Sequence, residues 1–135
     1  MNDAKVEGGC LCGAVRYRVC GPLLSSSICH CPTCRRASGA PAVAWFVVRL
    51  DHFELLRGDL TTFASSAPVI RQFCGRCGSQ IVYRNDDAPA LIELTTATLD
   101  DPEVFPPTRE IWLSHRIAWE AVDPQREQDP EESHA

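Results

Sequence analysis

The spacing of the cysteines is the feature of this chain that most constrains its fold. Of the eight cysteines, all but Cys20 lie in the short segments "CLC", "CHCPTC" and "CGRC", at positions Cys10, Cys12, Cys29, Cys31, Cys34, Cys74 and Cys77. Residues i and i+2 of an extended segment point to the same side, and a Cys-x-x-Cys segment forms a tight knuckle. Both spacings let neighbouring thiolates share an ion, so the chain is predicted to bind zinc.

Seven sulfur ligands can form one closed site and one open site. Four thiolates complete the tetrahedral shell of a structural zinc, whereas three protein ligands with an exchangeable fourth position are typical of a catalytic zinc. One division joins Cys10 and Cys12 to Cys74 and Cys77, and leaves Cys29, Cys31 and Cys34 on one short loop. The spacing also allows residues 10, 12, 29 and 31 to share an ion, with residues 34, 74 and 77 around the other.

The N-terminal segment "MNDAKVEGGC" bears on the oxidation state of these cysteines. It has neither the apolar core of a secretory signal nor the pattern of a transit peptide, so we expect a cytoplasmic protein. Thiol buffers keep cysteines reduced in that compartment, which favours metal ligands over disulfides. Four disulfides, or one zinc with spare thiols, are the alternatives.

Length, apolar content and charge exclude several classes of protein. The 135 residues suit one zinc-binding domain, which we place at residues 1–122. No window reaches the ~18 consecutive apolar residues of a membrane span, and no basic stripe is present to bind nucleic acid. The formal net charge is −5, and residues 123–135 hold five acidic residues against one arginine. We expect this acidic tail to be disordered.

Short runs of alternating apolar and polar residues predict a mainly β fold with very little helix. The expected strands cover residues 14–19, 42–50, 52–58, 69–73, 79–84 and 90–97. Gly, Pro, Asn, Asp and Ser separate these runs and supply the backbone conformations of turns. One or two helical turns are expected after Cys31, and the proline-rich segment "DDPEVFPPTRE" is expected to be a surface loop.

Six motifs occur in an order that resembles one protein family. They are "GGCLCGAVRY", "CHCPTCRRASGAP", "GDLTTFASS", "RQFCGRCGSQI", "TTATLDDPE" and "IWLSHRIAW". From about Gly8 to Ala121 the chain is similar to the glutathione-dependent formaldehyde-activating enzyme (GFA) family, which includes the centromere protein V relatives. The resemblance implies several short coiled antiparallel sheets around zinc-binding cysteine knuckles.

The same resemblance implies roles for the cysteines. Cys10, Cys12, Cys74 and Cys77 would form a structural zinc site, and Cys29, Cys31 and Cys34 an open, labile second site whose fourth position takes solvent or a substrate thiol. The implied activity is that of a carbon–sulfur lyase, which reversibly joins formaldehyde and glutathione into S-(hydroxymethyl)glutathione. Cys20 lies outside the family's pattern, and we expect it to be a half-buried cysteine at a strand end.

The charge of the open site favours chemistry on a thiol. Three thiolates leave Zn²⁺ with a formal charge of −1, since +2 minus 3 is −1, and this damps its Lewis acidity. The ion still favours the thiolate form of a bound thiol, which is the nucleophilic form. We therefore expect a small-molecule thiol such as glutathione to attack a small aldehyde at a catalytic centre formed by Cys29, Cys31 and Cys34.

Arginines that follow the third ligand are the candidates for binding the substrate. Arg35 and Arg36 could each hold a carboxylate of glutathione in two hydrogen bonds, and Arg35 is the first choice. Arg71, Arg76 and Arg84 lie near the other knuckle. For any one of these five arginines the alternative is a solvated side chain at the surface.

Histidines and aromatic residues near the clusters are further candidates. His30, between two ligands, could act as a general acid or base, although adjacent residues of an extended turn point apart. Trp45 and Phe46 could form a wall of the substrate pocket, with packing in the core as the alternative. The same alternative applies to His115 and Trp119.

Three rival functions use the same cysteines. A zinc-stabilised binding module would close the second site with a further ligand, and a redox-sensitive zinc protein would release its metal when Cys29, Cys31 and Cys34 are oxidised. A zinc-ribbon binder of nucleic acid is opposed by the acidic charge balance. An exposed, labile second metal with affinity for thiols would distinguish the enzyme from these rivals.

Overall fold

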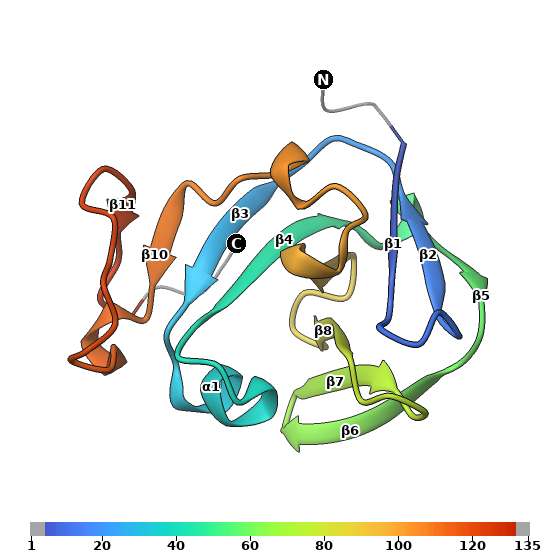
Figure 1. The fold of residues 1–135 in the computed structure, drawn as a ribbon, viewed down its shortest axis with the longest axis horizontal. Helices are drawn as coiled ribbons and strands as arrows, with labels where there is room; N and C mark the ends of the chain where they lie inside the picture. Colours follow the sequence, from blue (N-terminus) through green and yellow to red (C-terminus); the bar gives the residue numbers. More distant parts are fainter. Residues whose placement is uncertain (1–4, 132–135) are drawn as a thin grey trace.

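The computed structural model describes residues 5–131, within which eleven strands form two β-sheets. The smaller sheet has the order β1–β2–β5, with bounds Val6–Gly9, Arg16–Val19 and Phe53–Arg57. The larger sheet has the order β11–β10–β3–β4–β9–β8–β7–β6. Figure 1 shows β1, β2 and β5 at one end of the molecule and β10 and β11 at the other. The predicted mainly β fold is therefore confirmed.

The strands of the larger sheet pair antiparallel except around β10, which runs parallel to both β3 and β11. Their bounds are Ser25–Cys29 (β3), Val43–Arg49 (β4), Leu60–Ser66 (β6), Val69–Cys74 (β7), Gln80–Asn85 (β8), Leu91–Thr95 (β9), Arg109–Ile111 (β10) and Glu127–Gln128 (β11). Short 3₁₀ turns connect them at Leu50–His52, Thr96–Thr98, Pro102–Val104 and Leu113–His115. Each predicted strand overlaps an observed one.

Helix α1, Pro32–Ser38, follows Cys31 as predicted and is the one α-helix within residues 5–131. Cys31 is its N-cap: the Cys31 sulfur accepts a hydrogen bond from the backbone N–H of Cys34 at 3.3 Å. Proline suits the first helical position because the N–H it lacks would have no partner there. The helix ends at Gly39, whose φ of 71° is left-handed and favours glycine.

Strand β4 separates two buried clusters because successive side chains of a strand point to opposite faces. Phe46 packs in the main core with Tyr17 of β2 and Leu94 of β9. Its neighbour Trp45 packs in a second cluster on the other face, with Cys29 among its members. Both aromatic side chains are fully buried. The larger sheet thus holds the main core on one face and a cysteine-bearing cluster on the other.

Two parts of the chain differ from the sequence-based expectation. The segment "DDPEVFPPTRE" was predicted to be a surface loop, but its last residues, Arg109 and Glu110, begin β10 beside β3. Its Phe105 packs in the main core, where its ring lies 5.1 Å from that of Phe46. The prolines end before Thr108, so the following backbone N–H groups can join the ladder.

Residues 123–131 belong to the tail for which disorder is expected, and in the structure they include strand β11. β11 pairs with β10, and the backbone N–H of Asp129 donates to the carbonyl of Glu110 at 2.9 Å. Arg109 also pairs with Asp129 at 2.5 Å. Backbone hydrogen bonds and ion pairs hold this segment, which has no large apolar side chain to bury. Residues 132–135 lie outside the described part of the chain.

No helix within residues 5–131 is long and apolar enough to cross a bilayer.

Candidate metal centres

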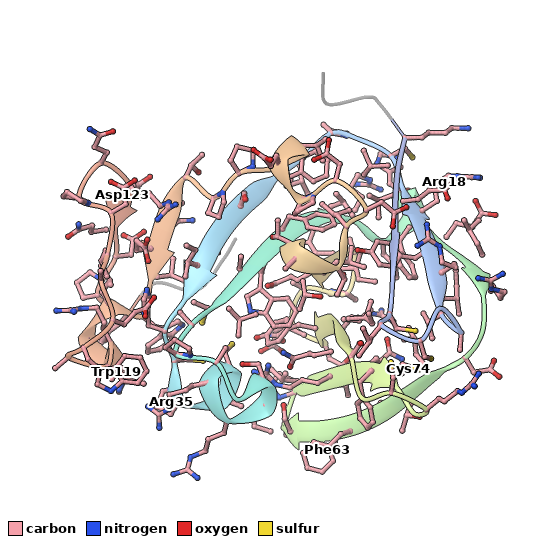
Figure 2. The ribbon with its side chains drawn as sticks, viewed as in Figure 1. Arg18, Arg35, Phe63, Cys74, Trp119 and Asp123 are labelled. Carbon is pink, nitrogen blue, oxygen red and sulfur yellow. The ribbon has the colours of Figure 1, made fainter. Side chains whose placement is uncertain are left out.

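The four-cysteine cluster consists of Cys10, Cys12, Cys74 and Cys77, whose sulfur atoms all lie within 4.8 Å of one another. The first two come from the β1–β2 turn, and the others come from the end of β7 and the turn before β8. Figure 2 labels Cys74 at the end of β7. The cluster therefore joins a turn of the smaller sheet to a turn of the larger one.

The sulfur separations of this cluster fit a tetrahedral ion. The Cys10 and Cys12 sulfurs are 3.6 Å apart, and those of Cys12 and Cys74 are 3.8 Å apart. Zinc–sulfur bonds of about 2.3 Å in a tetrahedron place neighbouring sulfurs about 3.8 Å apart. The chain thus already holds these thiols at the spacing that a zinc ion requires.

Hydrogen bonds to sulfur support the thiolate form in this cluster. The backbone N–H groups of Val15 and Arg76 donate to the sulfurs of Cys10 and Cys74 at 3.2 and 3.4 Å. The Ser79 hydroxyl lies 3.3 Å from the Cys77 sulfur, and this hydrogen bond lowers the pKa of Cys77 to about 5. A lowered pKa favours the form of cysteine that binds metal.

The three-cysteine cluster consists of Cys29 at the end of β3, Cys31 at the N-cap of α1, and Cys34 inside α1. Their sulfurs also lie within 4.8 Å of one another, and Cys29 and Cys34 are buried. The structure therefore shows the division into four and three cysteines. The alternative division, which mixed residues of both clusters, is not observed among residues 5–131.

The three thiols of this cluster compete for protons. Hydrogen bonding with Cys29 lowers the pKa of Cys31, and hydrogen bonding with Cys31 raises the pKa of Cys29. Without a cation, one thiolate accepts hydrogen bonds from its protonated neighbours, and the close sulfurs resist further ionisation. A bound cation would remove that resistance, so this donor set also fits a metal ion.

Arg71 of β7 contacts the three-cysteine cluster, although sequence reasoning favoured Arg35 and Arg36. Its two terminal nitrogens donate to the Cys34 sulfur at 3.8 and 3.7 Å, and the side chain is only 6% exposed. It also donates to Ser65 and Gln80 and lies over the Tyr83 ring, 5.2 Å from the ring centre. The pairing of β7 with β8 places Arg71 opposite Tyr83, which the cysteine spacing alone does not reveal.

The three-cysteine cluster lies in the wall of a cavity of about 270 Å³, which we call the thiol cavity. Arg71, Tyr83, Trp112 and His115 also line it. Trp112 has a φ of 56°, a left-handed conformation that is uncommon for a bulky residue and begins the turn leading to His115. His115 was predicted to pack in the core, but it is exposed and lines this cavity instead.

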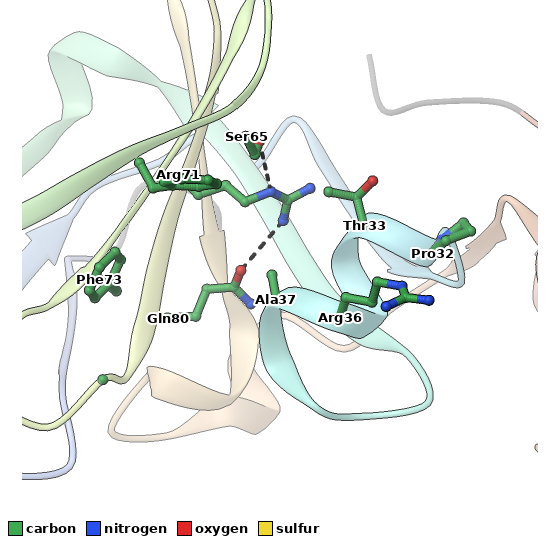
Figure 3. A pocket seen from close by; sticks show the side chains of 10 residues that line it. Pro32, Thr33, Arg36, Ala37, Ser65, Arg71, Phe73 and Gln80 are labelled. Atoms are coloured by element: carbon green, nitrogen blue, oxygen red, sulfur yellow. Dashed lines mark hydrogen bonds between the residues drawn. The ribbon is translucent and has the colours of Figure 1, made fainter.

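A larger groove of about 750 Å³ adjoins the thiol cavity, and the two share Pro32, Thr33 and Arg71. Figure 3 shows Arg71 and Gln80 on its sheet side and Thr33, Arg36 and Ala37 on its helix side. Phe63 and Phe73 add an apolar surface. The groove therefore offers one exposed cation, Arg36, beside apolar and neutral polar groups.

The other predicted site residues occupy different environments. His30 is 1% exposed and lies 2.6 Å from a carboxylate oxygen of Glu110; it lines neither the thiol cavity nor the groove. Trp45 is buried and packs edge-on against Tyr83, with 5.8 Å between ring centres. It therefore contacts a residue of the cavity wall without lining the cavity itself. Arg35 is half-buried and also lines neither space.

Two residues outside the predicted site are also informative. Cys20 belongs to neither cluster, and its sulfur lies 3.7 Å from the carbonyl oxygen of His52. This is the half-buried environment expected for it. Trp119, for which core packing was predicted, is instead 73% exposed (Figure 2).

The fold and the two clusters define a class of small, mainly β protein with paired cysteine sites arranged for metal ions. Within this class, the sequence model of the "Glutathione-dependent formaldehyde-activating enzyme" family, GFA, matches residues 5–115. This match covers most of the chain. The protein therefore belongs to the GFA family, as its motifs predicted.

Two known proteins are similar to this chain. A Halomonas elongata protein, named provisionally as a glutathione-dependent formaldehyde-activating enzyme, is 29% identical in an alignment of 135 positions, which covers 92% of this chain and 84% of that protein. A crystal structure of a Rhodobacter sphaeroides protein matches with a TM-score of 0.60 and 27% identity, over 73% of this chain and 93% of that one.

Proposed function

We propose that this protein is a zinc-dependent carbon–sulfur lyase that acts on a thiol–aldehyde adduct such as S-(hydroxymethyl)glutathione. The observation that carries the proposal is the position of Cys29, Cys31 and Cys34 in the wall of the thiol cavity. Three sulfur ligands beside an open space leave a position for a fourth, exchangeable ligand. The four-cysteine cluster has a complete set of sulfur ligands and suits a structural role.

The residues around the three-cysteine cluster favour a thiolate. A zinc ion bound by the three cysteines would supply positive charge that keeps an incoming thiol ionised. Zn²⁺ with three thiolates has a formal charge of −1, and the buried Arg71 guanidinium beside Cys34 offsets it. Arg71 thereby lowers the electrostatic cost of bringing a further thiolate into the cavity.

The reaction can be assigned to groups that line the thiol cavity. In the lyase direction, the adduct loses the proton of its hydroxyl group, a carbonyl bond forms, and the carbon–sulfur bond breaks with its electron pair on sulfur. The products are a thiolate and formaldehyde, and the reverse steps form the adduct. We assign removal of the hydroxyl proton to His115, which is exposed and lines this cavity. His30, buried against Glu110, does not line it.

The body of the thiol would lie in the adjoining groove. Its carboxylate would pair with Arg36, which is exposed there, and Phe63 and Phe73 would contact its apolar part. Arg35, the first choice from sequence, lies outside the groove. We place this activity in the cytoplasm, where reduced thiols are abundant.

The test combines zinc analysis with calorimetric titration of glutathione. We expect two zinc ions per chain and saturable thiol binding in the wild type, with one ion and no thiol binding in Cys31→Ser. Cys20→Ser is the matched control, because Cys20 lies outside both clusters, and it should behave like the wild type. A single ion and no thiol binding in the wild type would instead favour a zinc-stabilised binding module.

A further inference from the structure

A chain of polar groups, buried at His30 and Glu110 and half-buried at Arg126, leads from the three-cysteine cluster to the C-terminal segment, residues 123–131. His30 Nε2 lies 2.6 Å from Glu110 Oε1, where a ring N–H donates to the carboxylate. The other oxygen of the same carboxylate accepts a hydrogen bond from Arg126 at 2.8 Å. His30 and Glu110 are only 1% and 2% exposed, so their contact is shielded from solvent.

The backbone reinforces this connection. The N–H of His30 donates to the carbonyl of Ile111 at 3.1 Å, which continues the pairing of β3 with β10 beyond Cys29. Arg126 additionally donates to the carbonyl of Pro107 at 3.2 Å. Strand β10 therefore lies between the metal-ligand loop on one side and the C-terminal segment on the other.

We propose that His30, Glu110 and Arg126 are positioning residues that fix the three-cysteine cluster for metal binding. His30 is the residue between the ligands Cys29 and Cys31, so the direction of its side chain sets the course of the backbone that presents both sulfurs. The C-terminal segment takes part in the site through Arg126, although it contributes no ligand. This inference rests on the second metal site of the proposed function.

The physical reason is the burial of Glu110. A carboxylate out of water is stable when its charge is paired and its oxygens are hydrogen-bonded, and here Arg126 supplies the positive charge. Removal of that charge leaves Glu110 uncompensated, so the carboxylate moves toward water or changes its contact with His30. Either response loosens the loop between Cys29 and Cys31, whereas the four-cysteine cluster shares no residue with this chain of contacts.

The experiment follows zinc transfer from the full-length protein to an excess of a chromogenic chelator. The wild type should release its two ions in a fast phase from the three-cysteine cluster and a slow phase from the four-cysteine cluster. Arg126→Met should accelerate the fast phase about 10-fold, the lower end of the effect of outer contacts on metal affinity. It should leave the slow phase unchanged, and Arg126→Lys, which restores the charge, should recover part of the loss.

The control variant is Arg49→Met, which removes an exposed ion pair with Asp51 remote from this chain of contacts. Hydrogen exchange at the backbone N–H of His30 adds a readout that needs no metal. This exchange should be faster in Arg126→Met than in the wild type, and unchanged in Arg49→Met. Equal acceleration of both release phases, or no change in either, would overturn the positioning role. A wild type that releases one ion in one phase would overturn the proposed second site, and unchanged His30 exchange would separately overturn the contact chain.

Discussion

Replacement of Cys74 by serine tests whether the four-cysteine cluster is structural. Cys12 and Cys74 are 62 positions apart, so a metal that joins them restricts a long loop of the unfolded chain. By the chain-entropy relation for cross-links, a loop of this length corresponds to about 4 kcal/mol of stability. For a domain of this size, that is a fall of about 15 °C in the unfolding midpoint.

Cys31→Ser provides the comparison, because it also removes one ligand. Its partners Cys29 and Cys34 lie in the same six-residue segment, so metal binding there closes only a short loop. The same relation gives about 2 kcal/mol, or about 7 °C. We therefore expect Cys31→Ser to remain folded and to lose one zinc ion, with a midpoint well above that of Cys74→Ser.

Scanning calorimetry under reducing conditions, with zinc content measured on the same samples, makes this comparison. Cys20→Ser serves as the control for loss of a thiol outside both clusters. Equal falls in the midpoint for Cys74→Ser and Cys31→Ser would refute the division into a structural and an open site. So would retention of both ions in Cys74→Ser.

Three further substitutions test the groove, a buried carboxyl group and the main core. Arg36→Ala should raise the Kd of a carboxylate-bearing thiol about 3- to 5-fold in calorimetric titration, whereas Arg35→Ala should not, because only Arg36 lines the groove. Burial raises the pKa of Glu93 from 4.5 to about 8, so the stability linked to its protonated form is fully present below pH 4.5 and is lost as the pH rises through about 8. Glu93→Gln should therefore flatten the dependence of the unfolding midpoint on pH over that range. An unchanged slope would contradict this. Phe46→Ala should lower the free energy of unfolding in urea by about 3–5 kcal/mol without changing zinc content, because Phe46 lies in the core and not in either cluster.

The cysteines were predictable because their local spacing carries the chemistry. A Cys-x-Cys or Cys-x-x-Cys segment presents two sulfurs together in almost any compact fold, so spacing identified the half-sites before the topology was known. The short apolar runs likewise predicted β4 and β9, because most residues of both strands are buried. Spacing did not decide which half-sites meet, because that depends on how the two sheets pack.

The surroundings that the sequence did not reveal depend on pairing between distant segments. Arg71 looked like one of several surface arginines until the register of β7 placed it against Cys34. His30 looked catalytic because it lies between ligands, but the parallel pairing of β10 with β3 brings Glu110 to its side chain. The C-terminal segment is expected to be disordered because it has no large apolar residue to bury, but its Arg126 pairs with a buried carboxylate 16 positions earlier in the chain.

In the proposed two-zinc protein, the division of the sulfur ligands would set an order for metal loading while the chain is being synthesised. All three ligands of the three-cysteine cluster leave the ribosome within six residues, so their loop can meet an ion early. The four-cysteine cluster must wait for Cys77, which follows Cys34 by 43 residues (77 minus 34). Until then the turn that carries Cys10 and Cys12 has no fixed partner. A cell short of zinc should therefore accumulate chains open to proteases at their N-terminal turn, and the abundance of this protein should follow its zinc supply.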